Sequence, residues 1–314
     1  MAILNTIDDF KGAVKINSST PINSLLPFVA DATDKYLIPY LGLEMVEKFD
    51  SELDESKDED KPYIALLPRV RRVLAPFTLH LGSSESSINF GDSGHTVSRG
   101  GSNAAPASDV KIEKSDKSLL SRGWQNLEYL LKELEDKEAT FQEWKESDYY
   151  KTRQTKFFNS AATFQESGLI NIDYKRLTFE KLRNNIIGIE KTEVWKLITG
   201  PVYDSILTSL SDEKKEARRL RLVECIRAYI GNRVAALHTS QTTRVQRSQN
   251  NTLEYQAVIR PLYGDLEDTG NYYTRQSDFW KNEIIELLPD FGVDFSGDAL
   301  KFNAPERSIM LDIG

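Results

Sequence analysis

Cysteine and histidine are scarce in this sequence, and that limits the metal and redox chemistry to expect. Cys225 is the one cysteine among 314 residues, which excludes an internal disulfide and a cysteine-rich zinc module. It lies in the apolar run 222–230, so we expect a buried thiol and not a nucleophile. The histidines, His80, His95 and His238, form no HxxxH or HExxH pair, and two of them end predicted helices as end-caps. We therefore expect no metal site, no cofactor and no catalytic residue.

Long apolar runs are missing as well. No run approaches about 18 residues, so no membrane-spanning helix is expected. The opening MAILNTIDDF lacks the basic region and the apolar core of a secretory signal, which predicts use in a reducing cytoplasm. The net charge of −8 lacks the basic excess of a general nucleic-acid coat, although it leaves room for a local basic patch.

The motifs that cradle phosphates or calcium are absent too. The chain has no GxxxxGK[ST], no GxGxxG after a strand and no GxSxG. The glycines at 91, 94 and 100–101 lie in polar sequence without a following apolar helix. The acidic segment 50–61 lacks the central glycine of an EF-hand loop, and Lys61 stands where the bidentate glutamate should be. We predict a solvated charged loop there.

What the sequence does contain is an internal repeat. Residues 20–49 and 178–207 match at a constant offset of 158, with low identity. A cap, an apolar pattern and a breaking glycine stay in register, which is typical of a repeated structural unit more than of a repeated catalytic site. The matched pairs are Thr20 and Thr178, Phe28 and Ile186, Val29 and Ile187, Tyr36 and Val194, Leu37 and Trp195, Tyr40 and Ile198, Gly42 and Gly200, Met45 and Tyr203, and Phe49 and Leu207.

The fold prediction is mainly α, with two pseudo-repeated helical units, short β-hairpin insertions and an extended C-terminal tail. Each unit has a long amphipathic helix, a break at Gly42 or Gly200, a shorter helix, a charged loop and two further helices. We expect Leu37 and Trp195 to be buried against the helices that follow. The predicted domains are the first helical unit at 1–140, an aromatic-rich bridge at 141–165, the second helical unit at 166–291 and the tail at 292–314.

Three polar or broken segments interrupt these units. A Ser/Gly/Asn-rich arm at 83–118 contains the hairpin pattern 88–97, and an insertion at 239–275 has strand-like residues around 253–259. The tail, 292–314, carries apolar residues separated by Gly, Ser, Asp and Pro, which favours an extended assembly element.

Charged residues recur in both units and have more than one interpretation. Asp31 with Asp34, and Glu190 with Glu193, are carboxylate pairs of the kind that serve acid–base catalysis. Spacing of three residues also marks the wet face of an amphipathic helix, which is the stronger interpretation. Basic clusters near the start of each third helix suit nucleic acid, partner carboxylates or solvent equally well. These basic residues are Arg69, Arg71, Arg72, Lys214, Lys215, Arg218, Arg219 and Arg221.

Several packing motifs resemble those of known virion proteins. The stretch LLPFVADATDKYLIPYLGLEMVEKF is similar to the opening helices of head–tail connector (adaptor) proteins of tailed bacteriophages. The order of motifs resembles a family of virion structural proteins from phages and prophages of Bacteroidetes, the crAss-like phages included. The other motifs are NFGDSGHTV, FQEWKESDYY, AATFQESGLINID and FEKLRNNIIGIEKTEVWKLITGPVYDSIL.

The resemblance implies a homo-oligomeric, dodecameric ring in the virion neck, assembled in the host bacterial cytoplasm. The portal protein and tail or neck proteins would be its partners, and genomic DNA would pass through the channel without specific binding. It supplies no catalytic residue and no cofactor. Two alternatives stay open: another tail-completion or capsid-associated virion protein, and a hydrolase that uses the paired carboxylates.

Overall fold

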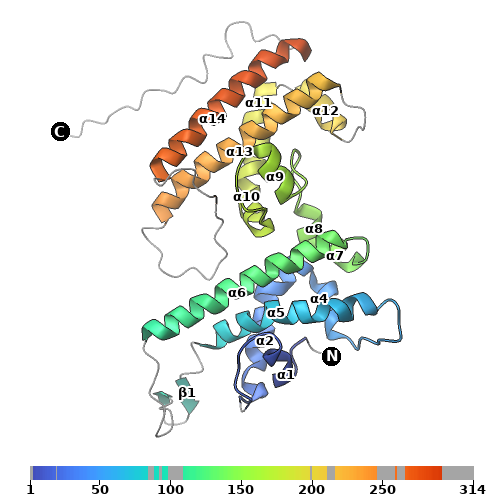
Figure 1. Cartoon of the computed structure of the whole chain (residues 1–314), viewed down its shortest axis with the longest axis vertical. Coiled ribbons are helices and arrows are strands. Elements are labelled where there is room, and N and C mark those ends of the chain that lie inside the picture. The colour runs from blue at the N-terminus through green and yellow to red at the C-terminus, as the bar shows by residue number, and fades with distance from the viewer. Residues whose placement is uncertain are drawn as a thin grey trace, which may run out of the picture. The chain divides into compact units, whose positions relative to one another are not determined.

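The computed structural model describes residues 3–18, 20–83, 88–91, 94–97, 109–198, 200–210, 216–245, 259 and 266–291. These residues are mainly helical, as predicted. The chain divides into two compact units (Figure 1). Unit 1 is Met1–Gln154 with Thr252–Tyr255, and unit 2 is Thr155–Asn251 with Gln256–Gly314. None of the described helices combines the length and the apolar composition that crossing a membrane requires.

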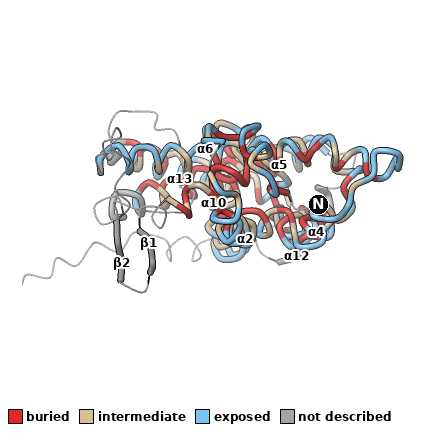
Figure 2. Tube along the Cα trace, turned by 90° about the horizontal axis from the view of Figure 1, so that it is seen from below, coloured by how far each residue is buried: buried red, intermediate tan, exposed pale blue. Residues whose placement is uncertain are grey.

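Unit 1 is organised around two long helices, α5 and α6, which lie side by side (Figure 1). Pro68 and Pro76 lie inside α5, and the helix continues through both. Buried and exposed positions alternate in the first half of α5, up to Arg72, as an amphipathic helix requires (Figure 2), whereas residues 73–78 are all buried. The helices of unit 1 are α1 (Ile7–Lys11), the 3-10 turn η1 (Ile22–Ser24), α2 (Leu26–Ala32), the π-helix η2 (Thr33–Leu37), α3 (Ile38–Leu41), α4 (Leu43–Asp50), α5 (Lys61–Ser83), α6 (Asp109–Asp136), α7 (Gln142–Glu146) and α8 (Asp148–Thr152).

Two short strands lie between α5 and α6 in the chain. They are β1 (Ile88–Gly91) and β2 (Gly94–Val97), paired antiparallel with Ile88 opposite Val97 and Gly91 opposite Gly94. The rest of the predicted arm up to residue 108 lies outside the described residues, as do the predicted tail and residues 246–258 and 260–265 of the insertion. The predicted bounds are wrong at the helical ends, because 109–118 belong to α6, 239–245 to α13 and 266–275 to α14.

The core of unit 1 contains an aromatic stack at the π-helix. Tyr36 stacks on Phe77 with ring centroids 4.0 Å apart, and Trp124 stands edge-on to both rings. Stacks of this kind add about 0.5–1.5 kcal/mol per pair beyond the burial of area. A Cβ at Gly123 would lie 2.6 Å from the Phe77 ring, so this glycine lets α6 approach α5. Leu37 is completely buried, which confirms that expectation.

Unit 2 is organised around α13 and α14, which also lie side by side (Figure 1). The short α9 packs against α13 where two glycines meet, because a Cβ at Gly231 would lie 2.2 Å from the Gly168 carbonyl oxygen. Its helices are α9 (Ala161–Gly168), α10 (Arg176–Ile189), the π-helix η3 (Glu190–Val194), α11 (Trp195–Ile198), α12 (Gly200–Ser209), α13 (Ala217–Val245), α14 (Leu266–Leu287) and the 3-10 turn η4 (Leu288–Phe291).

The predicted aromatic bridge, 141–165, divides between the two cores. Trp144 is fully buried in unit 1, where its indole N–H donates to the Tyr40 carbonyl at 3.1 Å. Phe157, Phe158 and Phe164 belong to the core cluster of unit 2. The boundary between the units falls between residues 154 and 155, so the segment is not a separate element.

The two units follow the same order of helices, but not at the predicted constant register. In each, an α-helix runs into a π-helix, then one α-turn, and a new helix begins at or after a glycine. The π-helices begin 157 residues apart, at Thr33 and Glu190, while the glycines are 158 apart. Buried Leu37 therefore corresponds to buried Val194 and not to Trp195.

The prediction that Trp195 is buried is wrong for that reason. Its side chain is 52% exposed, because the one-residue shift in register places Val194 on the core side of η3 and turns the next residue outward.

Candidate functional site: the backbone clamps of the two units

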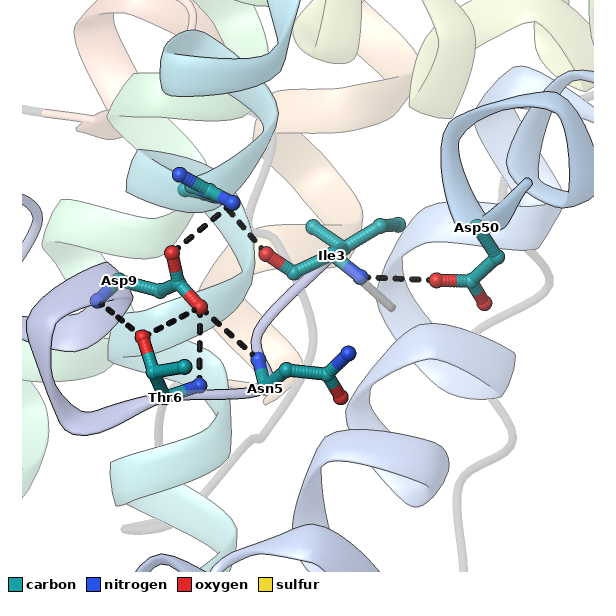
Figure 3. Close-up of polar contacts among 6 residues, drawn as sticks. Ile3, Asn5, Thr6, Asp9 and Asp50 are labelled. Atoms are coloured by element: carbon teal, nitrogen blue, oxygen red, sulfur yellow. Dashed lines mark hydrogen bonds and ion pairs between the residues drawn. The ribbon is translucent and has the colours of Figure 1, made fainter. Parts of the chain in front are cut away.

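The most elaborate polar cluster of unit 1 holds the main chain of Ile3 (Figure 3). Its N–H donates to Asp50 Oδ1 at 2.8 Å, and its carbonyl accepts from Arg71 Nε at 2.9 Å. Asp50 ends α4, and Arg71 lies on α5. Both backbone groups of one buried residue are thus fixed by side chains from two different helices, and we call this arrangement a backbone clamp.

Asp9 joins the clamp to the first helix. Its Oδ1 lies 2.9 Å from Arg71 Nη2. Its Oδ2 accepts from the Asn5 N–H at 3.0 Å, the Thr6 N–H at 2.9 Å and the Thr6 hydroxyl at 2.9 Å (Figure 3). Thr6 in turn caps α1 by accepting from the Asp9 N–H, which completes a capping box. One carboxylate therefore fixes the start of α1 and the guanidinium that holds Ile3.

Unit 2 contains a second backbone clamp, on Phe157. Its N–H donates to Glu190 Oε1 at 3.1 Å, and its carbonyl accepts from Arg227 Nε at 2.8 Å. The Lys156 N–H donates to the other oxygen of Glu190 at 3.3 Å. Arg71 and Arg227 each lie ten residues beyond the first residue of their helices, Lys61 and Ala217.

Burial makes the second clamp electrostatically different from the first. Glu190 is 1% exposed, and burial raises the pKa of its carboxyl group, an effect partly offset by hydrogen bonds from Thr155, Phe157 and Lys156. Burial also lowers the pKa of Arg227. Asp50, which has the role of Glu190 in unit 1, is exposed.

Both clamps hold backbone groups with charged side chains. Every oxygen and nitrogen described above is engaged with a main-chain group or an opposite charge. The net contribution of one hydrogen bond to a charged group is about 1.5–3 kcal/mol of folding stability. Each clamp therefore fastens the first segment of its unit to a long helix, α5 in unit 1 and α13 in unit 2.

The two predicted carboxylate pairs have different environments. Asp31 and Asp34 are exposed, as a wet helix face requires. Glu190 is instead the buried clamp residue, and the wet-face interpretation is wrong for it because the core segment 156–157 lies against it. Glu193 accepts from Arg233 Nε at 3.1 Å and from the Tyr229 hydroxyl. The two pairs share no geometry.

The predicted basic clusters pair largely with carboxylates of their own units. Arg69 lies 3.4 Å from Glu133, and Arg71 belongs to the clamp. In unit 2, Arg218 lies 3.4 Å from Asp290 and Arg221 lies 3.1 Å from Glu283, across the α13–α14 pair and its end. The remaining members have these places: Arg219 lies 3.7 Å from Glu216, Arg72 is exposed, and Lys214 and Lys215 lie outside the described residues.

The histidines lie apart from one another in the sequence and take no common role. His80 is buried within α5, and its Nδ1 lies 2.7 Å from Asp116 Oδ1 on α6. The Ser83 hydroxyl donates to the same oxygen at 2.8 Å. His80 lies in the last turn of α5, as expected, and its side chain joins α5 to α6 through Asp116. His238 lies within α13 and His95 within β2.

The acidic loop 50–61 uses part of its charge internally. Asp60 is buried, lies 2.8 Å from Lys48 Nζ and accepts from the Asp54 N–H at 3.0 Å. These contacts lower the pKa of Asp60. Within the described ranges, no group of three or more His, Cys, Asp or Glu side chains is arranged to hold a metal ion.

Cys225 is buried in the core of unit 2, as predicted. Burial raises the pKa of its thiol, which favours the unreactive protonated form.

A family of unknown function, DUF6712, matches residues 33–154, from the first residue of η2 to the end of unit 1. No curated protein and no solved structure matches the chain.

The sequence reasoning missed the clamps, although a short repeated pattern follows each clamped residue by two positions. Asn5-Thr6 with Phe10, and Asn159-Ser160 with Phe164, repeat the same spacing 154 residues apart. Thr6 and Ser160 are both helix N-caps, and both phenylalanines are fully buried. The clamp partners themselves carry no such signal, since a carboxylate at the end of α4 performs in unit 1 what a π-helical carboxylate performs in unit 2.

Proposed function

We propose that this chain is a structural component of a phage virion, a head–tail connector (adaptor) ring subunit at the portal–tail interface. The observation that carries the proposal is the pair of backbone clamps. In both units charged side chains fasten chain segments to long helices, which makes rigid blocks of the kind that an assembly needs. The choice of a head–tail connector ring among possible assemblies rests on the resemblance of the sequence motifs to connector proteins.

In such a ring, the two units and three segments between or after their helices have assembly roles. The two units are pseudo-repeats that give one subunit two similar helical blocks. The β1–β2 hairpin with the rest of the arm up to residue 108, the insertion between α13 and α14 and the tail 292–314 clasp neighbouring subunits, the portal protein or tail proteins. The location is the virion neck, after assembly in the host bacterial cytoplasm.

Net charge supports the passage of DNA without specific binding. The chain carries −8 overall, and most basic residues of the predicted clusters face carboxylates of the same unit. A surface with few unpaired cations releases few counterions on contact with phosphates, so duplex affinity is low.

Negative-stain imaging and native mass spectrometry of the full-length chain, alone and mixed with the portal protein encoded beside it, test the proposal. We expect closed rings of one stoichiometry that bind the portal. A chain that binds only capsid or tail-tip proteins would support the tail-completion alternative. A metal-dependent hydrolysis abolished by both Asp31→Asn and Glu193→Gln would overturn the structural role.

A further inference from the structure

The surface of unit 2 contains an exposed tryptophan between two exposed lysines. Trp195 is 52% exposed, and Lys191 and Lys196 beside it are exposed as well. Positions four apart share one face of a helix, so Lys191 lies next to the indole on one side and Lys196 adjoins it in sequence. We call these three residues the tryptophan patch.

Neighbouring carboxylates do not neutralise the tryptophan patch. Glu190 is buried and accepts from the backbone of residues 156 and 157. Glu193 is bound by Arg233 at 3.1 Å and by the Tyr229 hydroxyl. Both acids of η3 are thus used inward, which leaves a positively charged aromatic surface of the kind that anchors interfaces.

Unit 1 carries the reciprocal arrangement on α4. Leu43 is 55% exposed, and Glu44 and Glu47, one and four residues later, are exposed beside it. Lys151 interacts with Glu44, but its ammonium lies 2.8 Å from Glu146. The acidic surface continues into the loop 50–61, where Glu52, Glu55 and Glu59 are exposed. We call Leu43, Glu44 and Glu47 the leucine patch.

We propose that the tryptophan patch of one subunit docks on the leucine patch of a second copy of this chain. An exposed apolar side chain flanked by two lysines meets one flanked by two glutamates, so apolar area and opposite charge are satisfied together. Because the two patches consist of different residues, one in unit 1 and one in unit 2, the contact is heterologous, and such contacts close into rings or continue as filaments. This inference rests on the proposed function and names its contact.

The patches are anchors within a larger contact. A stable interface buries about 1,200–2,000 Å², more than these six residues supply, and the central aromatic residue carries a large share of the binding energy. Trp195→Ala should therefore weaken self-association by roughly 30-fold or more. Phe279→Ala, at a position 50% exposed on α14, is the matched control and should leave association unchanged.

Charge reversal gives a sharper test by sedimentation velocity on the full-length chain. Lys191→Glu with Lys196→Glu, and separately Glu44→Lys with Glu47→Lys, should each give monomers. Asp31→Lys with Asp34→Lys changes the same charge on another exposed face of unit 1 and should assemble normally. Mixing the two monomeric variants should restore assembly with alternating copies, because the intact patches match in charge and so do the two reversed patches.

Placing all four reversals in one chain should restore assembly of that chain with itself. Failure of this rescue, or normal assembly of either double variant, would overturn the proposed contact while leaving the ring itself intact. Wild-type chain that stays monomeric at its highest soluble concentration would overturn both this contact and the proposed function.

Discussion

Unit 1 and unit 2 have the same order of helices but hold those helices together by different means. Unit 1 joins its long helices through an aromatic stack of Tyr36, Phe77 and Trp124. Unit 2 places Gly168 of α9 directly against Gly231 of α13, backbone to backbone. Helices can therefore follow in the same order while packing through different contacts. Each helix buries a broad apolar face, and no single contact on that face decides which helix packs against it.

The largest effect is expected at the glycine contact of unit 2. In Gly231→Ala the new Cβ would lie 2.2 Å from a backbone oxygen, which no rotamer change relieves, so we expect a loss of about 3 kcal/mol in unfolding free energy. Urea unfolding followed by circular dichroism measures it. Gly188→Ala, in α10 with open space at its Cβ, is the control and should stabilise by roughly 0.5–1 kcal/mol. Equal effects at the two sites would remove the close contact from the comparison.

The clamps should contribute similarly in both units. Arg227→Met leaves the buried Phe157 carbonyl without its donor and should cost about 2 kcal/mol. Arg71→Met loses the Ile3 carbonyl bond and the Asp9 ion pair and should cost about the same, since Asp9 keeps three other donors. Hydrogen exchange in α1 and α9 locates the loss. Faster exchange in α9 from Arg71→Met, with α1 unchanged, would contradict separate clamps.

A smaller penalty is expected where a glycine faces an aromatic ring. Gly123→Ala would bring a Cβ to 2.6 Å from Phe77, whose ring turns more readily than a backbone moves. We expect a loss of about 1–2 kcal/mol. Gly123→Ala with Phe77→Leu should recover part of that loss in a double-mutant cycle. Additive costs would show that the ring is not the obstacle.

The smallest expected effects are opposite pH dependences. Glu190 has a raised pKa through burial, so its folded form binds a proton more tightly. Its contribution to stability is greatest at low pH and is lost as pH rises through the folded pKa. Asp60 has a lowered pKa through Lys48 and the Asp54 N–H. Its contribution is present above the unfolded pKa and is lost as pH falls through the folded pKa.

Urea midpoints between about pH 2 and pH 8 separate these two groups, because Asp60 acts below its unfolded pKa and Glu190 acts above its own. Glu190→Gln should make stability fall less as pH rises, and Asp60→Asn should make it fall less on acidification. Parallel profiles for the two variants would contradict the assigned environments.

Sequence reasoning predicted the helical class and the burial of Leu37 and Cys225, because periodic apolar residues report on those features directly. It placed helix starts at Thr20 and Thr178, whereas α2 begins at Leu26 and Thr178 lies inside α10. It failed at Trp195 because the glycine follows the π-helix by one more residue in unit 2 than in unit 1, so an alignment on the glycines is displaced by one residue at the π-helix. The clamps could be predicted only in part, since their carboxylates come from unrelated positions in the two units. Burial of Glu190 depends on tertiary contacts with residues 155–157, which local periodicity does not contain.

The clamp on Phe157 has a mechanical consequence. The clamped residue lies three positions after Gln154, where unit 1 ends, so tension along the chain from that side reaches Glu190 and Arg227 before it reaches α9. The N–H and the carbonyl of Phe157 are held by two different helices, so a pulling force loads both bonds together and cannot peel them in turn. The clamp therefore transmits the pulling force to α10 and α13, and α9 bears less of that force.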